Sequence, residues 1–150
     1  MRTVLLGISL TFGLMVNAFA AEFGTAEEAQ VLVKKAIAHI QSAGPEKAYA
    51  DFTAKNPEFV NKDLYVFVND VKGNTLAHGT NEKLVGRNMS DLKDVDGKAF
   101  LNEISEKAKT QDSFSVDYKF TDPVTKKILP KTIFCERLKD TAVCSGIYKR

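Results

Sequence analysis

Residues 64–68, Leu-Tyr-Val-Phe-Val, are apolar at every position, and this run constrains the fold more than any other part of the sequence. In a strand, successive side chains point to opposite faces. One face would carry Leu64, Val66 and Val68, and the other would carry Tyr65 and Phe67. A strand that is apolar on both faces is covered on both sides. We therefore predict a strand over about 63–69, within a sheet that has a covering layer on each face.

Turn residues follow this run, and a short second strand returns from the turn. Asp70 suits the first position of a turn, and Gly73 can adopt the left-handed backbone of a bulged hairpin. The segment 75–78 then pairs with the first strand, and we expect the pair to form a central hairpin of the sheet. The returning strand ends at His78, one of two histidines in the chain.

Helical patterns flank the hairpin. Apolar residues recur at helical spacing over 26–43, preceded by a capping box formed by Thr25 and Glu28. Gly44 and Pro45 then fit a helix end followed by a second helix over about 45–54. A long polar loop with a turn or two of helix is expected over 81–96. A third helix is expected near 97–109.

The C-terminal third contains three predicted strands, over 114–120, 128–138 and 141–149. The order of elements is helix, helix, strand, strand, helix, strand, strand, strand. This order predicts an α+β fold with an antiparallel sheet of about five strands and a long N-terminal helix.

The first twenty residues have the pattern of a secretory signal peptide. Arg2 supplies positive charge, the run 4–16 is mostly apolar, and Ala18-Phe19-Ala20 fits a small-x-small cleavage site. An uncleaved N-terminal anchor is the alternative, although the run is short for a membrane span. We expect a periplasmic or secreted domain over 21–150. The formal net charge of +2 lacks the basic excess typical of nucleic-acid-binding proteins, so no nucleic-acid partner is expected.

The two cysteines are predicted to form a disulfide across the last hairpin. A turn centred between residues 139 and 140 places Cys135 directly opposite Cys144, close to the spacing that a disulfide needs. The same register sets Lys131 against Tyr148, on the same face as the cysteines, because side chains alternate with a period of two. Two buried free thiols are the alternative.

Several segments together resemble the single Cache domain of the second type, a PAS-like extracytoplasmic sensor module. They are YVFVNDVKGNTLAHGTNEKLVGRNMSDLKDVDGKAF, VDYKFTDPVTKKILPKTIF and CSGIY. The most specific pieces are the D-x-x-G-N turn with the following Ala-His, the DLKDVDGK loop and the terminal SGIY. The resemblance covers about residues 26–149. The sequence departs from the family at Gly79, where a proline is usual, and near Ser115, where an aromatic residue is common.

This resemblance implies a ligand-binding sensor domain, exported on its own, that signals through a membrane receptor or sensor kinase. Its ligand, most often a small organic acid, would lie between the sheet and the covering loops. The expected ligand-binding residues are Tyr65, Phe67, His78, Tyr118, Lys131 and Tyr148. Lys131 would supply the cation, the two later tyrosines and the histidine would donate hydrogen bonds, and the first two residues would form an aromatic floor.

Structural roles remain open for three of these residues. Lys131 could be a solvated edge-strand lysine, His78 could be a structural hydrogen-bonding residue, and Tyr148 could belong to the core. Two other classes of protein also remain open. One is a periplasmic interaction protein with a vestigial pocket, and the other is a cystatin-like or NTF2-like domain.

No pattern in the sequence indicates catalysis, a cofactor or a metal. There is no nucleophile with an identifiable base and no phosphate-binding loop. An EF-hand aligned on Gly97 would have Leu92 at its first ligand position, and leucine cannot bind calcium. The acidic residues near Gly97 are instead expected to lie at a helix N-terminus, where the helix dipole favours negative charge. We therefore predict a protein without enzymatic activity, cofactor or metal.

Overall fold

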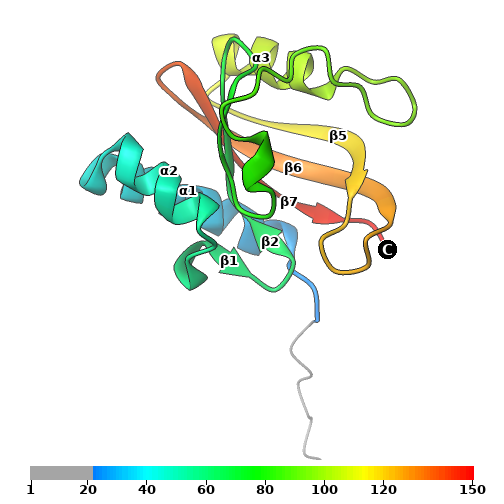
Figure 1. The fold of residues 1–150 in the computed structure, drawn as a ribbon, viewed down its shortest axis with the longest axis horizontal. Coiled ribbons are helices and arrows are strands. Elements are labelled where there is room, and N and C mark those ends of the chain that lie inside the picture. Colours follow the sequence, from blue (N-terminus) through cyan, green and yellow to red (C-terminus); the bar gives the residue numbers. More distant parts are fainter. Residues whose placement is uncertain (1–21) are drawn as a thin grey trace, which may run out of the picture.

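The computed structural model describes residues 22–150, so the expected signal peptide over 1–20 lies outside the described residues. The described chain has the predicted α+β architecture, with helices on both faces of a five-stranded antiparallel sheet (Figure 1). The strand order is β4-β3-β7-β6-β5. These strands are β3 Phe67–Asp70, β4 Thr75–His78, β5 Ser113–Thr121, β6 Ile128–Leu138 and β7 Thr141–Tyr148.

The two N-terminal helices, α1 Ala26–Ala43 and α2 Pro45–Thr53, lie where they were predicted. The capping box is confirmed. The backbone N–H of Glu28 donates to the Thr25 hydroxyl at 3.2 Å, and the Thr25 N–H donates to the Glu28 carboxylate at 2.8 Å. Gly44, with φ of 86°, separates the helices in the left-handed region that glycine tolerates without cost.

The predicted strand over 63–69 is divided in two at Val66. Its first part, β2 Leu64–Tyr65, pairs with β1 Val60–Asn61 in a separate two-stranded sheet, and only its second part, β3, joins the main sheet. The turn between β1 and β2 contains Lys62 in a left-handed conformation. Periodicity did not reveal this short hairpin because β1 has only two residues.

The hairpin of β3 and β4 was predicted to be central, and this prediction is wrong. β4 is an edge strand, while β3 is bonded to β7 on its other side. The outer edge of β4 is covered by backbone hydrogen bonds from the following loop. Gly86 N–H donates to Thr75 O at 2.8 Å, and Thr75 N–H donates to Arg87 O at 3.0 Å. These bonds satisfy backbone groups that an edge strand would otherwise leave without partners.

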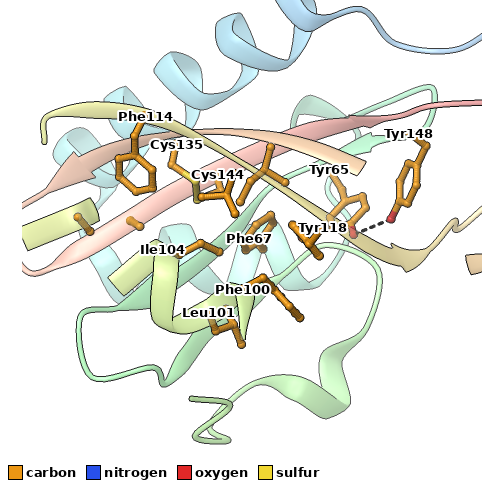
Figure 2. Packing of buried hydrophobic residues seen from close by; sticks show 14 residues of the cluster. Tyr65, Phe67, Phe100, Leu101, Ile104, Phe114, Tyr118, Cys135, Cys144 and Tyr148 are labelled. Atoms are coloured by element: carbon orange, nitrogen blue, oxygen red, sulfur yellow. Dashed lines mark hydrogen bonds between the residues drawn. A yellow bond between two sulfur atoms is a disulfide. The ribbon is translucent and has the colours of Figure 1, made fainter. Parts of the chain in front are cut away.

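Both faces of the sheet are covered, as the apolar run predicted. On the α1 face, α1 and α2 pack over a buried cluster that includes Leu64, Val66 and Val68. On the α3 face, the helix α3 Phe100–Thr110 packs over a second cluster that includes Tyr65 and Phe67 (Figure 2). The alternation of side chains in the apolar run therefore divides it between two separate clusters.

The third helix begins three residues later than predicted, because a turn precedes it. The Asp94 carboxylate accepts hydrogen bonds from the backbone N–H groups of Asp96 and Lys98, at 3.0 and 2.9 Å. Gly97 lies inside this turn with φ of 83°. The loop before the turn contains the single helical turn η2 Glu82–Leu84, in agreement with the prediction for 81–96.

The last hairpin has the predicted register. Cys135 lies opposite Cys144, and Lys131 lies opposite Tyr148. The two cysteines form a disulfide with a Cα–Cα distance of 4.2 Å, which confirms that prediction (Figure 2). Gly146 lies opposite Ile133 in the same ladder, and an added Cβ there would lie 2.3 Å from the carbonyl oxygen of Thr132. No larger residue fits at this position without a backbone shift.

Candidate functional site

The structure brings the six predicted site residues together on the α3 face of the sheet. Strand pairing places Phe67 opposite His78, and it places Lys131 between Tyr118 on β5 and Tyr148 on β7. Tyr65 precedes β3 on the same face, and its hydroxyl faces that of Tyr148 (Figure 2). The six residues come from six different strands, β2 to β7, and converge on one region beneath α3 and the covering loop.

The ammonium group of Lys131 lies at the centre of this region and is buried. The residue is 1% exposed. Its Nζ lies 4.3 Å from the ring centroid of Tyr65 and 4.9 Å from that of Tyr148. Three more rings surround it at 5.4 to 5.9 Å, those of Phe67, Phe120 and Tyr118. Lys131 is thus not the solvated edge-strand lysine of the alternative interpretation, because it lies inside an aromatic cage.

This buried charge has no carboxylate partner within residues 22–150. Its hydrogen-bond acceptor in that range is the hydroxyl of Tyr65, at 2.7 Å. An ammonium group has three donors, so two are left without an acceptor among the described residues. Lysine is rarely fully buried unless it is paired. The site therefore carries a positive charge that no carboxylate within residues 22–150 neutralises.

The tyrosine hydroxyls form a hydrogen-bond chain with a defined direction. Tyr148 donates its hydrogen to the carbonyl oxygen of Thr121 at 2.8 Å. Its oxygen lies 3.2 Å from the hydroxyl of Tyr65 and can only accept there, so Tyr65 is the donor in that bond. The Tyr65 oxygen in turn accepts from Lys131. Burial, together with the neighbouring Tyr65, raises the pKa of Tyr148, so its hydrogen is retained at neutral pH.

This chain changes the roles expected for two tyrosines. The hydrogens of Tyr65 and Tyr148 are both committed within the protein, so neither hydroxyl can donate to a ligand while the chain is intact. Both residues instead fix the position of the Lys131 ammonium. The sequence predicted that Tyr65, Tyr148 and Lys131 would lie in one site. The direction of the hydrogen bonds between them depends on the position of the Thr121 carbonyl, which strand register alone does not give.

Tyr118 differs from the other tyrosines because its hydroxyl has no hydrogen-bond partner within residues 22–150. Its ring stacks on Phe100 of α3, with centroids 4.1 Å apart and planes 2° from parallel. Burial raises the pKa of Tyr118, so the group remains a protonated phenol. A protonated hydroxyl without an acceptor within residues 22–150 is available to donate to a bound molecule.

His78 is held as a neutral ring with one free donor. Its Nδ1 accepts from the backbone N–H of Asn81 at 3.2 Å and from that of Thr80 at 3.4 Å. Burial, followed by repulsion from the Lys131 charge, lowers the pKa of His78 to about 3. A neutral ring whose Nδ1 accepts carries its proton on Nε2. This Nε2–H has no hydrogen-bond partner among the described residues.

Gly79 follows this histidine, at the position where the sequence departs from the family. Its N–H donates to the carbonyl oxygen of Val66 at 2.9 Å, a bond that proline could not form. An added Cβ would lie 3.0 Å from the Cβ of Tyr65. The backbone therefore passes directly against the tyrosine that holds Lys131, and glycine allows this close approach.

A small cavity adjoins the cage beneath the covering loop. It has a volume of about 30 Å³ and is lined by His78, Tyr118 and Thr75 on its polar side. Apolar side chains form the rest, among them Phe67, Phe100, Phe120, Leu84, Met89 and Leu92. A single water needs about 10–15 Å³ by this kind of measure. The cavity thus has room for a group of a few atoms, and three of its rings also surround the Lys131 ammonium.

Sequence reasoning missed the cavity residues outside the six. Phe120 could have been found, because it continues the alternation of Phe114, Val116 and Tyr118 along β5. Phe100 falls in the helix predicted near 97–109, and helical spacing alone does not mark it as a cavity residue. Met89 and Leu92 lie in an irregular loop, where no periodicity indicates which side chains turn inward.

Two further features bear on the chemistry of the molecule. Within residues 22–150, no group of three or more His, Cys, Asp or Glu side chains is placed to hold a metal ion. In the same range, no helix combines the length and apolar character needed to cross a membrane.

Comparison with known proteins gives consistent matches. The family model described as single Cache domain 2 matches residues 15–148. The methyl-accepting chemotaxis protein McpP of Pseudomonas putida is 31% identical over 88 residues, which cover 57% of this chain and 16% of that protein. The chain therefore matches less than one fifth of the length of this curated relative.

Two solved structures share the fold. A methyl-accepting chemotaxis protein from Vibrio parahaemolyticus aligns with a TM-score of 0.71 at 22% identity, covering 81% of this chain and 86% of that one. A Cache chemosensory domain, described for its recognition of carboxylic acids, aligns with a TM-score of 0.70 at 23% identity, covering 83% and 93%. At these identities the likeness concerns the fold.

Proposed function

The chain belongs to the single Cache domain 2 family, and on this premise we propose that it is an exported, non-catalytic sensor domain that binds a small carboxylate at Lys131. The family assignment excludes the cystatin-like and NTF2-like alternatives. Chemotaxis receptors among its relatives support a sensory role. A solved Cache domain described as recognising carboxylic acids supports the ligand class.

The observation that carries the proposal is the ammonium of Lys131, which has no carboxylate partner within residues 22–150. Removing a charge from water costs several kcal/mol even after relaxation. Cation–π contacts return about 0.5–2 kcal/mol, and the hydrogen bond to Tyr65 adds about 1.5–3 kcal/mol. A bound carboxylate would neutralise the charge and accept the ammonium donors that have no partner. The anion would complete a site that the protein alone leaves electrostatically incomplete.

The other free donors fit the same ligand. Tyr118 offers a phenolic hydrogen and His78 offers its Nε2–H, and both residues line the cavity. A carboxylate has two oxygens and can accept from several donors at once. The cavity of about 30 Å³ has room for a group of only a few atoms, so the acid would be a short one. Tyr65 and Tyr148 would hold the lysine, while Phe67 packs beside it.

Signalling belongs to the proposal as well. A domain that only binds a metabolite needs another molecule to transmit the signal, and we expect a membrane receptor or sensor kinase to do so. The domain would act outside the cytoplasm, in the periplasm or as a secreted protein.

The test is calorimetry with a series of monocarboxylates of increasing chain length, together with their uncharged amides. The shortest acids should bind and the amides should not. Lys131→Met keeps most of the side-chain length but removes the charge-assisted hydrogen bond of about 1.5–3 kcal/mol. Affinity should fall about ten- to a hundredfold, because each 1.4 kcal/mol is tenfold.

Lys34→Met is the matched control, because Lys34 is exposed on α1 and forms no ion pair within residues 22–150. Its affinity should equal that of the wild type. Equal binding of acids and amides, or unchanged affinity in Lys131→Met, would exclude Lys131 as the carboxylate site. Absence of binding across the whole series would favour the interaction-protein alternative.

A further inference from the structure

A second recess lies outside the cage, between two turns at the end of the sheet where β5 meets β6. It is a groove of about 270 Å³. One wall is the turn between β1 and β2, and the other is the turn between β5 and β6. We call it the lysine groove, and the lining residues that matter here are Lys55, Lys62, Lys126, Leu64, Tyr65 and Val124.

Its three lysines share an uncommon backbone conformation. Lys55, Lys62 and Lys126 have φ of 59°, 58° and 60°. Residues other than glycine rarely adopt positive φ, and asparagine and aspartate are the usual exceptions. Within residues 22–150 four non-glycine residues do so, and the fourth is Lys139. Three separate tight turns thus each place a lysine on the same groove.

The charge of the groove is positive. Lys62 is paired with Glu28 at 2.9 Å. Lys55 and Lys126 form no ion pair within residues 22–150. The one acidic residue that lines the groove is Asp63, and its carboxylate is already engaged by Arg150 at 2.8 Å and by the Gly24 N–H at 2.7 Å. Two lysine charges are therefore free to attract an anionic partner.

The two walls are held in place by one residue. Arg150 binds Asp63 in the first turn and Asp122 at the base of the second, each at 2.8 Å. Asp122 in turn accepts from the backbone N–H of Val124 at 3.2 Å and from the side chain of Thr125 at 2.7 Å. A groove whose walls are fixed in advance loses less entropy when it binds a partner.

We propose that the lysine groove docks an acidic segment of a partner protein. Charge complementarity supplies the attraction. Apolar groups lie beside the lysines, since Leu64 lines the groove and the Val124 side chain at its rim is 54% exposed. A segment that combines carboxylates with an apolar side chain matches this mixture. A flat bilayer surface could not enter the recess.

The groove also borders the ligand cage. Tyr65 lines the groove, and its hydroxyl accepts the hydrogen bond of Lys131. Thr80 lines it as well and binds His78 through its backbone N–H. A partner seated in the groove would therefore contact residues that touch two of the proposed ligand donors, Lys131 and His78. The docking proposal stands on the groove alone and does not depend on the carboxylate site.

The test uses nuclear magnetic resonance with a capped synthetic peptide in which glutamates alternate with leucines. At low ionic strength the peptide should shift the backbone amide signals of the three lysine turns and of Thr80. The double variant Lys55→Glu/Lys126→Glu should weaken binding at least about tenfold, equal to about 1.4 kcal/mol. Higher salt should weaken binding in the wild type, because exposed charges are screened.

The matched control is Lys72→Glu/Lys139→Glu, which changes the charge equally in the β3–β4 and β6–β7 turns. These turns are joined by a backbone hydrogen bond and lie at the end of the sheet opposite the groove (Figure 1). It should bind the peptide like the wild type. The proposal is overturned if the groove signals do not move, if a peptide with glutamine in place of glutamate binds equally well, or if the two double variants behave alike. Binding of the groove to anionic lipid vesicles but not to the peptide would also overturn it.

Discussion

Tyr118 and Tyr148 lie on either side of Lys131, and removing each hydroxyl should have opposite effects. Tyr148→Phe deletes a hydroxyl that makes two hydrogen bonds, to Thr121 and with Tyr65. Each such bond contributes about 0.5–1.5 kcal/mol, so the free energy of unfolding should fall by about 1–3 kcal/mol. Tyr118→Phe deletes a hydroxyl without a partner within residues 22–150. Stability should then change little, because no hydrogen bond within the described residues is lost.

Ligand affinity should show the reverse pattern. If the Tyr118 hydroxyl donates to a bound carboxylate, its loss removes a bond to a charged group worth about 1.5–3 kcal/mol, and affinity falls at least about tenfold. Tyr148 does not donate to the ligand, so Tyr148→Phe should change affinity by less than about threefold, or about 0.7 kcal/mol. Both substitutions keep the ring, so aromatic packing is matched.

The assay combines urea unfolding with calorimetry on the best-binding acid of the monocarboxylate series. We expect Tyr148→Phe to be less stable with nearly normal affinity, and Tyr118→Phe to be fully stable with weak binding. Two variants with the same pattern, or with the patterns exchanged, would show that the assigned hydrogen-bond direction is wrong. Normal affinity in both would remove Tyr118 from the ligand contacts.

Three further predictions follow from single features of the described chain. The pKa of His78 is lowered from 6.5 to about 3 in the folded protein, so below pH 6.5 the unfolded chain binds a proton that the folded chain does not bind. The free energy of unfolding should therefore fall on acidification by up to about 1.4 kcal/mol per pH unit. The difference between wild type and His78→Gln, measured from pH 6.5 to 5, should show this slope. Replacing Cys135 and Cys144 by alanine should lower the free energy of unfolding by about 2.6 kcal/mol in the chain-entropy model, and equal denaturation midpoints would contradict it. The buried Ser145 hydroxyl lacks a hydrogen-bond partner in the described range, so Ser145→Ala should raise stability by about 1 kcal/mol, and a loss by urea unfolding would reveal an unseen partner such as an ordered water.

Features set by neighbouring residues in the sequence were predictable. The capping box fixed the start of α1, and a turn at Lys139 and Asp140 fixed the register that pairs Cys135 with Cys144. The same register placed Lys131 beside Tyr148. Each of these inferences needs only local geometry and the two-residue period of a strand, which is why the structure reproduces them closely.

Features set by distant segments were not predictable. Apolar residues on both faces of a strand indicate that both faces are covered, but they do not indicate which strands lie beside it. The hairpin of β3 and β4 was therefore wrongly predicted to be central, although β4 is an edge strand. The inward turn of Met89 depends on loop conformation rather than on periodicity. The Arg150 contacts join residues 87 and 28 positions apart, and no spacing rule in the sequence brings these charged groups together.

The two apolar clusters on opposite faces of the sheet have a consequence for how this protein can evolve. Alternation assigns each strand side chain to one cluster, and the sheet backbone separates the two. Substitutions on opposite faces should therefore combine additively, within about 0.3–0.5 kcal/mol, as for sites that share no contacts. Mutations around the cage can then reshape ligand preference while the layer beneath α1 maintains foldability, so that new specificities can arise without rebuilding the scaffold.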